Sequence, residues 1–220
     1  MLRSSFYILA FGGFTYSFYY DVMHLPNLRG GSWFGKLVFL THITFVITVT
    51  YFSLSLLRTL NSRSDRLKQL CDFIYSRLAF PLTLAVFILF WGLYAVDREL
   101  VFPKWMDKFI PGWHNHMVHT LPAAALLVDT VLVRHKIPSR KALLQACILF
   151  SCFYFSIVFG VFYTQGWWLY PVFEFLSPLF RAVFIAFVTF LLWLLYALEV
   201  SFNRFIWGPS VILADQRKEK

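Results

Sequence analysis

The sequence predicts an all-α, polytopic membrane protein built as a bundle of six transmembrane helices. Hydrophobic residues make up 59% and aromatic residues 21% of the 220-residue chain, whereas charged residues make up only 14%. Several stretches of about twenty residues, the length that crosses a hydrocarbon core of about 30 Å, lack Asp, Glu, Lys and Arg. These stretches are expected to be helices, because a backbone inside the bilayer must satisfy its own hydrogen bonds.

Six apolar segments are the expected helices. In chain order they cover residues 5–20, 36–57, 79–96, 114–133, 142–163 and 179–203. The first is the weakest, because it is short and carries Gly12 and Gly13. Most tryptophans lie near segment ends, where an amphipathic ring prefers the headgroup region. The bundle is therefore expected to occupy residues 1–207, and residues 208–220 are expected to form a charged cytosolic tail.

The positive charges predict how the bundle is oriented. Lys and Arg number 14 in the loops and termini on one side of the predicted bundle and 6 on the other. Because cytosolic loops carry the excess of Lys and Arg, both termini are expected in the cytosol, in the cell membrane or the endoplasmic reticulum. A net charge of +9 would suggest nucleic-acid binding in a soluble protein. Here the cations lie in short loops between apolar runs, so no nucleic-acid partner is expected.

Polar side chains inside two segments suggest a site. Hydroxyl residues recur at helical spacing in the second segment, at Thr41, Thr44, Thr48 and Ser55. Such a stripe is typical of helix packing, and this is the interpretation for the last three. In the fourth segment, His116 and His119 are expected on one helix face, with Thr130 further along the same side. Ionisable residues inside a membrane usually line a cavity.

Thr41 and His119 are expected at similar depth. Thr41 follows Lys36 by five residues and His119 follows Trp113 by six, which gives about 7.5 Å and 9 Å at 1.5 Å per residue. A threonine hydroxyl becomes a competent nucleophile beside a base, and neutral histidine is the usual base near pH 7. The sequence therefore predicts a two-residue Thr–His catalytic site.

No acidic residue is clearly placed to orient His119 as the third member of a catalytic triad. Asp129 lies about 15 Å deeper than His119 at 1.5 Å per residue, and Glu199 lies near the cytosolic end of its segment. Asp97 and Glu99 are on the correct side and could each orient His119 or be an interfacial charge. Histidines 114, 116 and 119 could bind a metal, but the other histidines are isolated, so no metal and no cofactor is predicted.

The three cysteines are not expected to form a structural disulfide. Cys71 is expected in a loop. Cys147 and Cys152 are five residues apart on one predicted helix, about 7.5 Å along its axis, which is too far for an undistorted bridge.

Short motifs along the chain carry a resemblance to a known family. They are GGSW (30–33), FLT (39–41), LAFP (78–81), DRE (97–99), FIPGW-NH--HT (109–120), YPV (170–172) and NRFIW (203–207). In order and spacing, to about Trp207, the sequence resembles the androgen-induced protein family. The resemblance implies a multi-pass threonine hydrolase that cleaves fatty acid esters of hydroxy fatty acids and disfavours glycerolipids. It implies Thr41 as nucleophile and His119 as base.

Two other classes of function stay open, a lipid-binding membrane regulator without catalysis and a small transporter. The Thr41 and His119 pair favours the enzyme over the regulator. No duplicated half is visible in the sequence, which disfavours a transporter built from repeats.

The implied lipid substrate keeps a free carboxylate, which would be costly to bury unpaired. A cation on the non-cytosolic side is expected to receive it. Arg98 is the first candidate, because a guanidinium binds a carboxylate bidentately, and Lys36 is the second. Arg98 could equally pair with Asp97 or Glu99 at the surface. For the oxyanion of the reaction, the starts of the second and fourth helices offer unpaired N–H groups.

Overall fold

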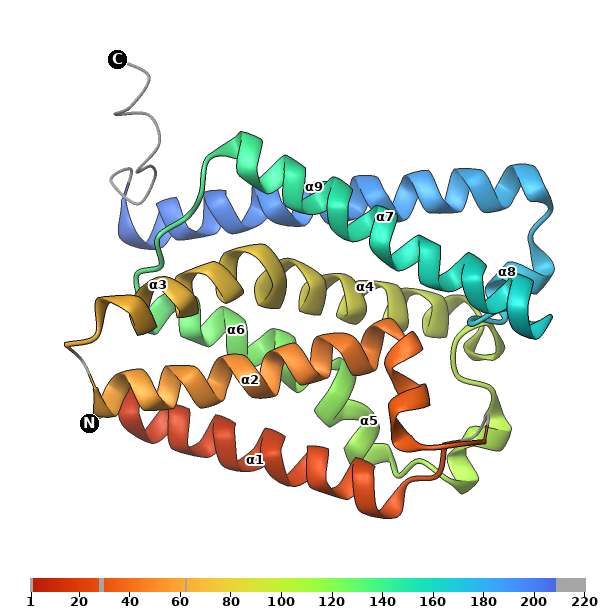
Figure 1. The fold of residues 1–220 in the computed structure, drawn as a ribbon, viewed down its shortest axis with the longest axis horizontal. Coiled ribbons are helices and arrows are strands. Elements are labelled where there is room, and N and C mark those ends of the chain that lie inside the picture. The colour runs from red at the N-terminus through yellow and green to blue at the C-terminus, as the bar shows by residue number, and fades with distance from the viewer. Residues whose placement is uncertain (1, 28–29, 62, 209–220) are drawn as a thin grey trace.

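The computed structural model describes residues 2–27, 30–61 and 63–208, and all regular secondary structure in these ranges is helical. The main helices run along one long axis of the molecule (Figure 1). The beginning of α1 (Leu2–His24) and the end of α9 (Pro178–Trp207) lie at the same end of the bundle, called the terminal end below. The predicted tail lies outside the described residues, except for Gly208.

The remaining elements are grouped here by length and type. The long helices are α2 (Leu40–Leu60), α4 (Phe80–Val96) and α7 (Arg140–Gln165), and the shorter ones are α3 (Asp65–Ile74), α5 (Gly112–His119), α6 (Leu121–Leu132) and α8 (Val172–Phe175). A π-helical turn, η2 (Tyr75–Ala79), joins α3 to α4 without interruption. Short 3-10 turns are η1 (Trp33–Val38), η3 (Arg98–Leu100) and η4 (Lys104–Lys108).

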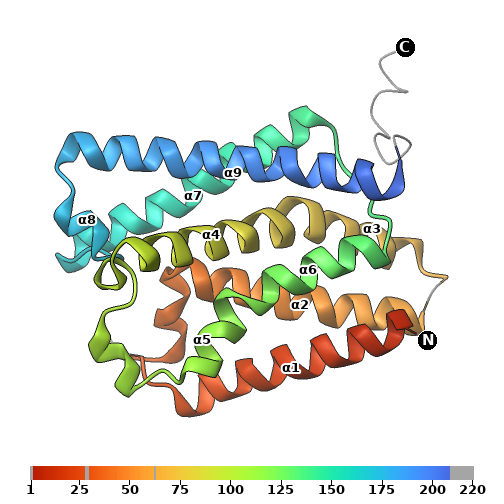
Figure 2. The ribbon, with the colours of Figure 1, turned by 180° about the vertical axis from the view of Figure 1, so that it is seen from behind.

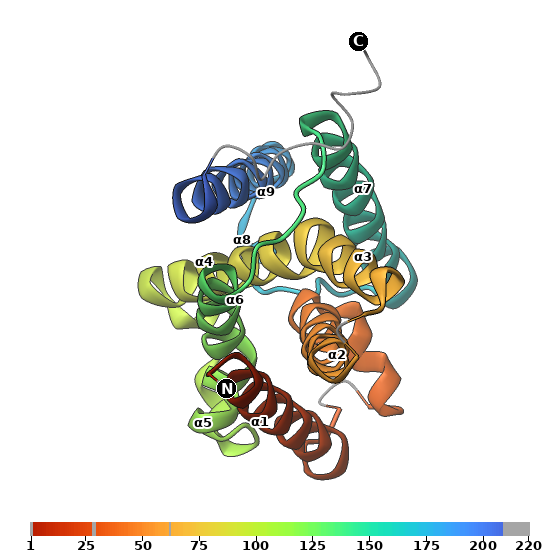
Figure 3. The same ribbon diagram turned by 90° about the vertical axis from the view of Figure 1, so that its left-hand side faces the viewer.

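Helix α4 lies in the middle of the bundle. Viewed along the bundle, α1, α2, α5 and α6 lie on one side of it, and α7 and α9 lie on the other (Figure 3). Its sequence, FPLTLAVFILFWGLYAV, is apolar on every face, as expected of a helix that neighbours surround. Phe80, Leu82 and Ala85 of α4 are accordingly part of the buried core.

Four helical stretches of the described chain are long and apolar enough to cross a membrane. They are Leu40–Leu60, Asp65–Val96, Arg140–Gln165 and Pro178–Trp207. The described chain is thus an all-helical membrane protein with four candidate membrane-spanning helices, and the predicted count of six is not confirmed. The first predicted segment forms α1, whose sequence is interrupted by polar residues and by Arg3 and Asp21.

The fourth predicted segment is not one helix, so the prediction of a continuous span over 114–133 is wrong. Helix α5 ends at His119 and α6 begins at Leu121, so the chain bends between them (Figure 2). Pro122 has no N–H to donate to the carbonyl of Val118, which interrupts the helix at this point as its position predicted. The break places His119 at a helix end.

Two further boundaries differ from the prediction. The segment 36–57 is not a single helix, because η1 ends at Val38 and α2 begins at Leu40. Thr41 is therefore in the first turn of α2, and the depth argument that counted a helix from Lys36 does not hold. Cys71 is not in a loop but is buried in α3, where Ser64 caps the helix by accepting a hydrogen bond from the N–H of Leu67.

Candidate functional site

Thr41 and His119, 78 residues apart in the sequence, meet inside the bundle at the end opposite to the terminal end. The distance from Thr41 Oγ1 to His119 Nε2 is 3.2 Å. Thr41 is the second residue of α2, and His119 is the last residue of α5. The contact is therefore made between two helix ends, one set by the start of α2 and the other by the break before Pro122.

The other ring nitrogen of His119 fixes the orientation of the imidazole. His119 Nδ1 lies 3.0 Å from the backbone carbonyl oxygen of Asn115, one helical turn earlier. Because a carbonyl only accepts hydrogen bonds, neutral His119 carries its proton on Nδ1 and presents the Nε2 lone pair to Thr41. The ring also stacks on Phe90 at a centroid distance of 3.6 Å. This arrangement can remove a proton from the threonine hydroxyl.

The first turn of α2 leaves one backbone donor free beside this pair. The N–H groups of His42 and Ile43 donate to the carbonyl of Phe39, and the N–H of Leu40 donates to two tyrosine hydroxyls. Among the described residues, the N–H of Thr41 has no hydrogen-bond partner. An unpaired donor at a helix start is suited to binding an anion.

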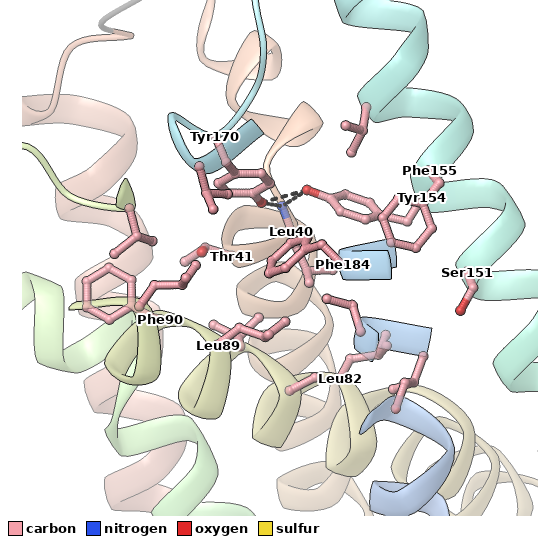
Figure 4. A pocket seen from close by; sticks show the side chains of 18 of the residues that line it. Leu40, Thr41, Leu82, Leu89, Phe90, Ser151, Tyr154, Phe155, Tyr170 and Phe184 are labelled. Carbon is pink, nitrogen blue, oxygen red and sulfur yellow. Dashed lines mark hydrogen bonds between the residues drawn. The ribbon is translucent and has the colours of Figure 1, made fainter. Parts of the chain in front are cut away.

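The two tyrosines that cap α2 form a pair with a spare hydrogen. Tyr154 and Tyr170 accept from the N–H of Leu40 at 2.8 and 3.1 Å, and their hydroxyl oxygens are 2.6 Å apart (Figure 4). One hydroxyl donates to the other, so the second hydroxyl keeps a hydrogen that neither Leu40 nor its partner tyrosine can accept. The pair therefore offers one further donor near Thr41.

Two cavities meet at Thr41. The apolar cavity lies between α2, α4, α7 and α9 and has a volume of about 90 Å³; among the described residues, its polar lining side chains are Thr41, Ser151, Tyr154 and Tyr170 (Figure 4). The polar cavity has a volume of about 180 Å³, and its lining includes Asp21, Lys36, His42, His114, Asn115 and His119. Thr41, Phe90, Val101 and Tyr170 line both cavities.

Comparison with known proteins identifies the relatives of this chain. Residues 2–204 match the model of the FAR-17a/AIG1-like protein family. The chain belongs to this family. It is 35% identical over 216 residues to the androgen-induced gene 1 protein of Homo sapiens. This alignment covers 91% of this chain and 89% of the relative.

Two rodent proteins are also similar. The chain is 32% identical to the androgen-dependent TFPI-regulating protein of Mesocricetus auratus, over 80% of this chain and 79% of the relative. It is 34% identical to the protein of the same name from Rattus norvegicus, over 80% of each chain. No solved structure matches the chain. The family resemblance that the motifs suggested is therefore confirmed.

The other hydroxyl residues that the sequence singled out make their hydrogen bonds elsewhere than at His119. Thr44 Oγ1 donates to the carbonyl of Thr41 at 3.0 Å, and Thr48 Oγ1 donates to the carbonyl of Thr44 at 2.8 Å. Thr130 is buried and contacts the hydroxyl of Tyr75. Like the buried Ser55, these residues pack helices, as predicted for the stripe on α2.

The three histidines of α5 divide differently from the prediction. His119 shares the lining of the polar cavity with His114 and not with His116. His116 is exposed, stacks on Trp91 and lies 3.0 Å from Thr120 Oγ1. The three-residue spacing did not put His116 and His119 at one cavity, because the face of α5 that lines the cavity consists of positions 114, 115, 118 and 119.

None of the acidic residues considered from the sequence orients His119. Asp97 accepts from the N–H of Glu99, and Glu99 accepts from the N–H of Lys104, so both stabilise their own loop. Glu199 is buried on α9. Asp129 belongs to a buried group at the terminal end, called the Asp129 cluster: Tyr7, Tyr51, Asp72, Asp129 and His135. The carbonyl of Asn115, which sequence patterns could not reveal, takes the orienting role.

The two cations proposed to receive a carboxylate are both paired within the protein. Arg98 Nη2 donates to Asp107 at 2.7 Å, which raises the pKa of the guanidinium, and Arg98 lines neither cavity. Lys36 does line the polar cavity, but its ammonium donates to the side chain and carbonyl of Asp21 and to the carbonyl of Leu25. Each cation is thus already paired with a carboxylate of the protein.

The sequence missed several residues around Thr41. Tyr154 is one of many aromatic residues in a largely apolar helix, and Tyr170 was noted only as part of the YPV motif. Asp21 and His42 lie on different elements, with His42 Nε2 3.6 Å from Asp21 Oδ2. Across the described ranges, no group of three His, Cys, Asp or Glu residues is arranged to hold a metal.

Proposed function

We propose that this protein is a membrane-embedded ester hydrolase that acts on fatty acid esters of hydroxy fatty acids, with Thr41 as nucleophile and His119 as base. The observation that carries the proposal is the 3.2 Å contact between Thr41 Oγ1 and His119 Nε2, with Nδ1 held by the carbonyl of Asn115. It occurs where two cavities meet, so an ester bond placed there has room for a chain on each side.

The reaction divides into two acyl transfers. His119 Nε2 takes the proton of Thr41 as its oxygen attacks the ester carbonyl, and then gives the proton to the departing hydroxy fatty acid. A water molecule next loses a proton to His119 and attacks the acyl-threonine, which releases the fatty acid and restores Thr41. Neutral His119 suits both steps, because Nε2 alternates between accepting and donating while Nδ1 keeps its proton.

The developing oxyanion requires hydrogen-bond donors. The free N–H of Thr41 lies on the nucleophile itself, and the tyrosine pair carries one spare hydrogen beside the same cavity. Donors fixed in advance in a water-poor site stabilise transition-state charge more strongly than water does. We therefore assign the Thr41 N–H and the Tyr154 and Tyr170 pair to the oxyanion site.

The proposed orientation follows the charge distribution. The sequence predicts 14 Lys and Arg residues on the side of the chain termini and 6 on the other. We therefore propose that the terminal end faces the cytosol and that the Thr41 site opens toward the lumen or cell exterior. The membrane is the cell membrane or the endoplasmic reticulum.

Labelling with a fluorophosphonate probe tests the nucleophile, because the probe bonds covalently to activated hydroxyls. The expected result with purified protein is labelling and ester turnover in the wild type and in Thr44→Ala, and neither in Thr41→Ala. The Thr44 control removes a neighbouring hydroxyl of the same helix that bonds to the carbonyl of Thr41. His119→Ala should lose turnover, and adding it to Thr41→Ala should cost little more, since the two residues act as a unit. Turnover in Thr41→Ala would reject Thr41 as the nucleophile. No turnover in the wild type would instead favour a non-catalytic lipid-binding protein.

A further inference from the structure

We infer that the two cavities divide the ester between them: the acyl group transferred to Thr41 occupies the apolar cavity, and the hydroxy fatty acid that leaves occupies the polar cavity. The inference rests on the proposed function and adds to it which half of the lipid each cavity selects. The wall that includes Ser151, across the cavity from Thr41, then limits the length of the acyl chain, and Val188 of α9 belongs to the same lining.

The position of His119 sets the direction of the ester. His119 lines the polar cavity and is absent from the lining of the apolar cavity, whereas Thr41 lines both. In the first transfer, the bond between Thr41 Oγ1 and the acyl carbon forms and the bond from that carbon to the ester oxygen breaks. The proton that His119 took from Thr41 returns to this ester oxygen. The leaving oxygen must therefore be on the His119 side, which is the side of the polar cavity.

The apolar cavity has a length along α4 and a lining that suit an acyl chain. Along α4 its lining runs from Leu93 to Leu82, which is about 16 Å at 1.5 Å per residue. Ser151 lies across the cavity from Thr41 (Figure 4). Most of the wall consists of Leu, Val and Phe side chains, which suit a chain with no polar group beyond its carbonyl.

The polar cavity offers hydrogen bonds that the protein itself does not use. Among the described residues, His42 Nδ1, both ring nitrogens of His114 and Asn115 Oδ1 are buried without a hydrogen-bond partner. All three residues line this cavity, and His114 and Asn115 are 3% and 8% exposed. Buried polar groups without partners are costly. They are suited to the hydroxyl and carboxyl groups of the leaving acid and to the water that completes hydrolysis.

Substitutions that narrow the apolar cavity test whether it holds the acyl half of the ester. Ser151→Phe places a ring in its far wall, and Ser156→Phe makes the same change at an exposed position of α7. Val188→Phe with the control Val183→Phe, whose valine is 55% exposed, repeats the comparison on α9. Turnover by purified full-length protein is measured with two series of esters, one varying the acyl chain and the other varying the hydroxy fatty acid.

The expected result is a loss of kcat/KM of at least about 10-fold for long-acyl relative to short-acyl esters in Ser151→Phe and Val188→Phe, the scale on which a hydrophobic pocket rejects a chain that no longer fits. The control variants Ser156→Phe and Val183→Phe should keep the wild-type preference for acyl-chain length. In every variant, changing the length of the hydroxy fatty acid should leave kcat/KM relative to the wild type unchanged. A shift that follows the hydroxy fatty acid, or no shift in either folded variant, would overturn the division. Absence of wild-type turnover on every ester would instead reject the proposed function.

Discussion

The Thr41 site and the Asp129 cluster use the same kinds of residue to opposite effect. Each contains a histidine beside hydroxyl groups, and each joins helices distant in sequence. His135 has both nitrogens occupied by carboxylates, with Nε2 2.9 Å from Asp129 and Nδ1 3.1 Å from Asp72. His119 has one nitrogen on a backbone carbonyl and the other on the hydroxyl of Thr41.

The tyrosines differ in the same way. Tyr7 and Tyr51 both donate their hydroxyl hydrogens to the carboxylate of Asp129. Tyr154 and Tyr170 instead bond to each other and to the N–H of Leu40, which leaves one hydrogen without an acceptor in the pair.

The two regions also differ in whether their polar groups line a cavity. None of the residues of the Asp129 cluster lines either of the two cavities, whereas Thr41 and Tyr170 line both. A buried polar group whose partners are all protein groups stabilises the fold, and one that keeps a free donor or lone pair beside a cavity can bind and react. Spare hydrogen-bonding capacity, and not residue type, distinguishes the candidate site from the structural cluster.

Exchanging each histidine for glutamine should give the largest contrast. His119→Gln should lower kcat by about 10²–10⁴-fold, the contribution typical of a general base, with little change in melting temperature. His135→Gln should destabilise the protein by about 3–5 kcal/mol, because it leaves buried carboxylates without their partner, and should keep the kcat of the folded fraction. Turnover and thermal unfolding of both variants in detergent check this. A melting temperature lowered equally in both would remove the distinction between the two regions.

Removing one tyrosine hydroxyl from each region should sharpen the comparison. Tyr170→Phe is expected to lower kcat by about 10²-fold, the scale for loss of one oxyanion donor, while KM changes little. Tyr51→Phe is expected to cost about 1–3 kcal/mol in unfolding free energy, because Asp129 loses a buried donor. If kcat in Tyr170→Phe equalled that of the wild type, the tyrosine pair would only cap α2.

Thr44→Ala should have a smaller effect that belongs to the structural side of the comparison. It removes a hydrogen bond to the carbonyl of Thr41, which contributes about 1 kcal/mol to stability, and it leaves the hydroxyl of Thr41 beside His119. Stability and turnover measured on the same preparation check this. An inactive Thr44→Ala beside an active Thr41→Ala would mean that the nucleophile is one turn further along α2.

Arg98→Ala should have the smallest effect. Arg98 is paired with Asp107 and lies outside both cavities, so KM for a free-acid substrate and for its methyl ester should change equally and slightly. Steady-state kinetics on the two substrates measure this. A higher KM for the free acid alone would show that the guanidinium leaves Asp107 to bind the substrate carboxylate, as the sequence suggested.

The sequence by itself determined the class of the molecule and the identity of its unusual residues. Long runs without charge admit only helices in a bilayer, and the position of Pro122 predicted a helix irregularity. Thr41 and His119 were singled out by counting residues from the segment ends and by the family motifs that contain them. These features are local, so they can be read from neighbouring residues.

The tertiary structure alone decided which groups meet and which hydrogen bonds remain free. The capping of α2 at Leu40 by Tyr154 and Tyr170 depends on segments more than 100 residues away, and the pairing of Lys36 with Asp21 depends on the packing of η1 against α1. The depths of Thr41 and His119 were inferred from continuous helices, but the structure interrupts both helices. His116 and His119 were expected on one face from their three-residue spacing. Packing between helices settles these contacts, because the hydrogen bonds of a side chain depend on every neighbouring helix and not only on its own.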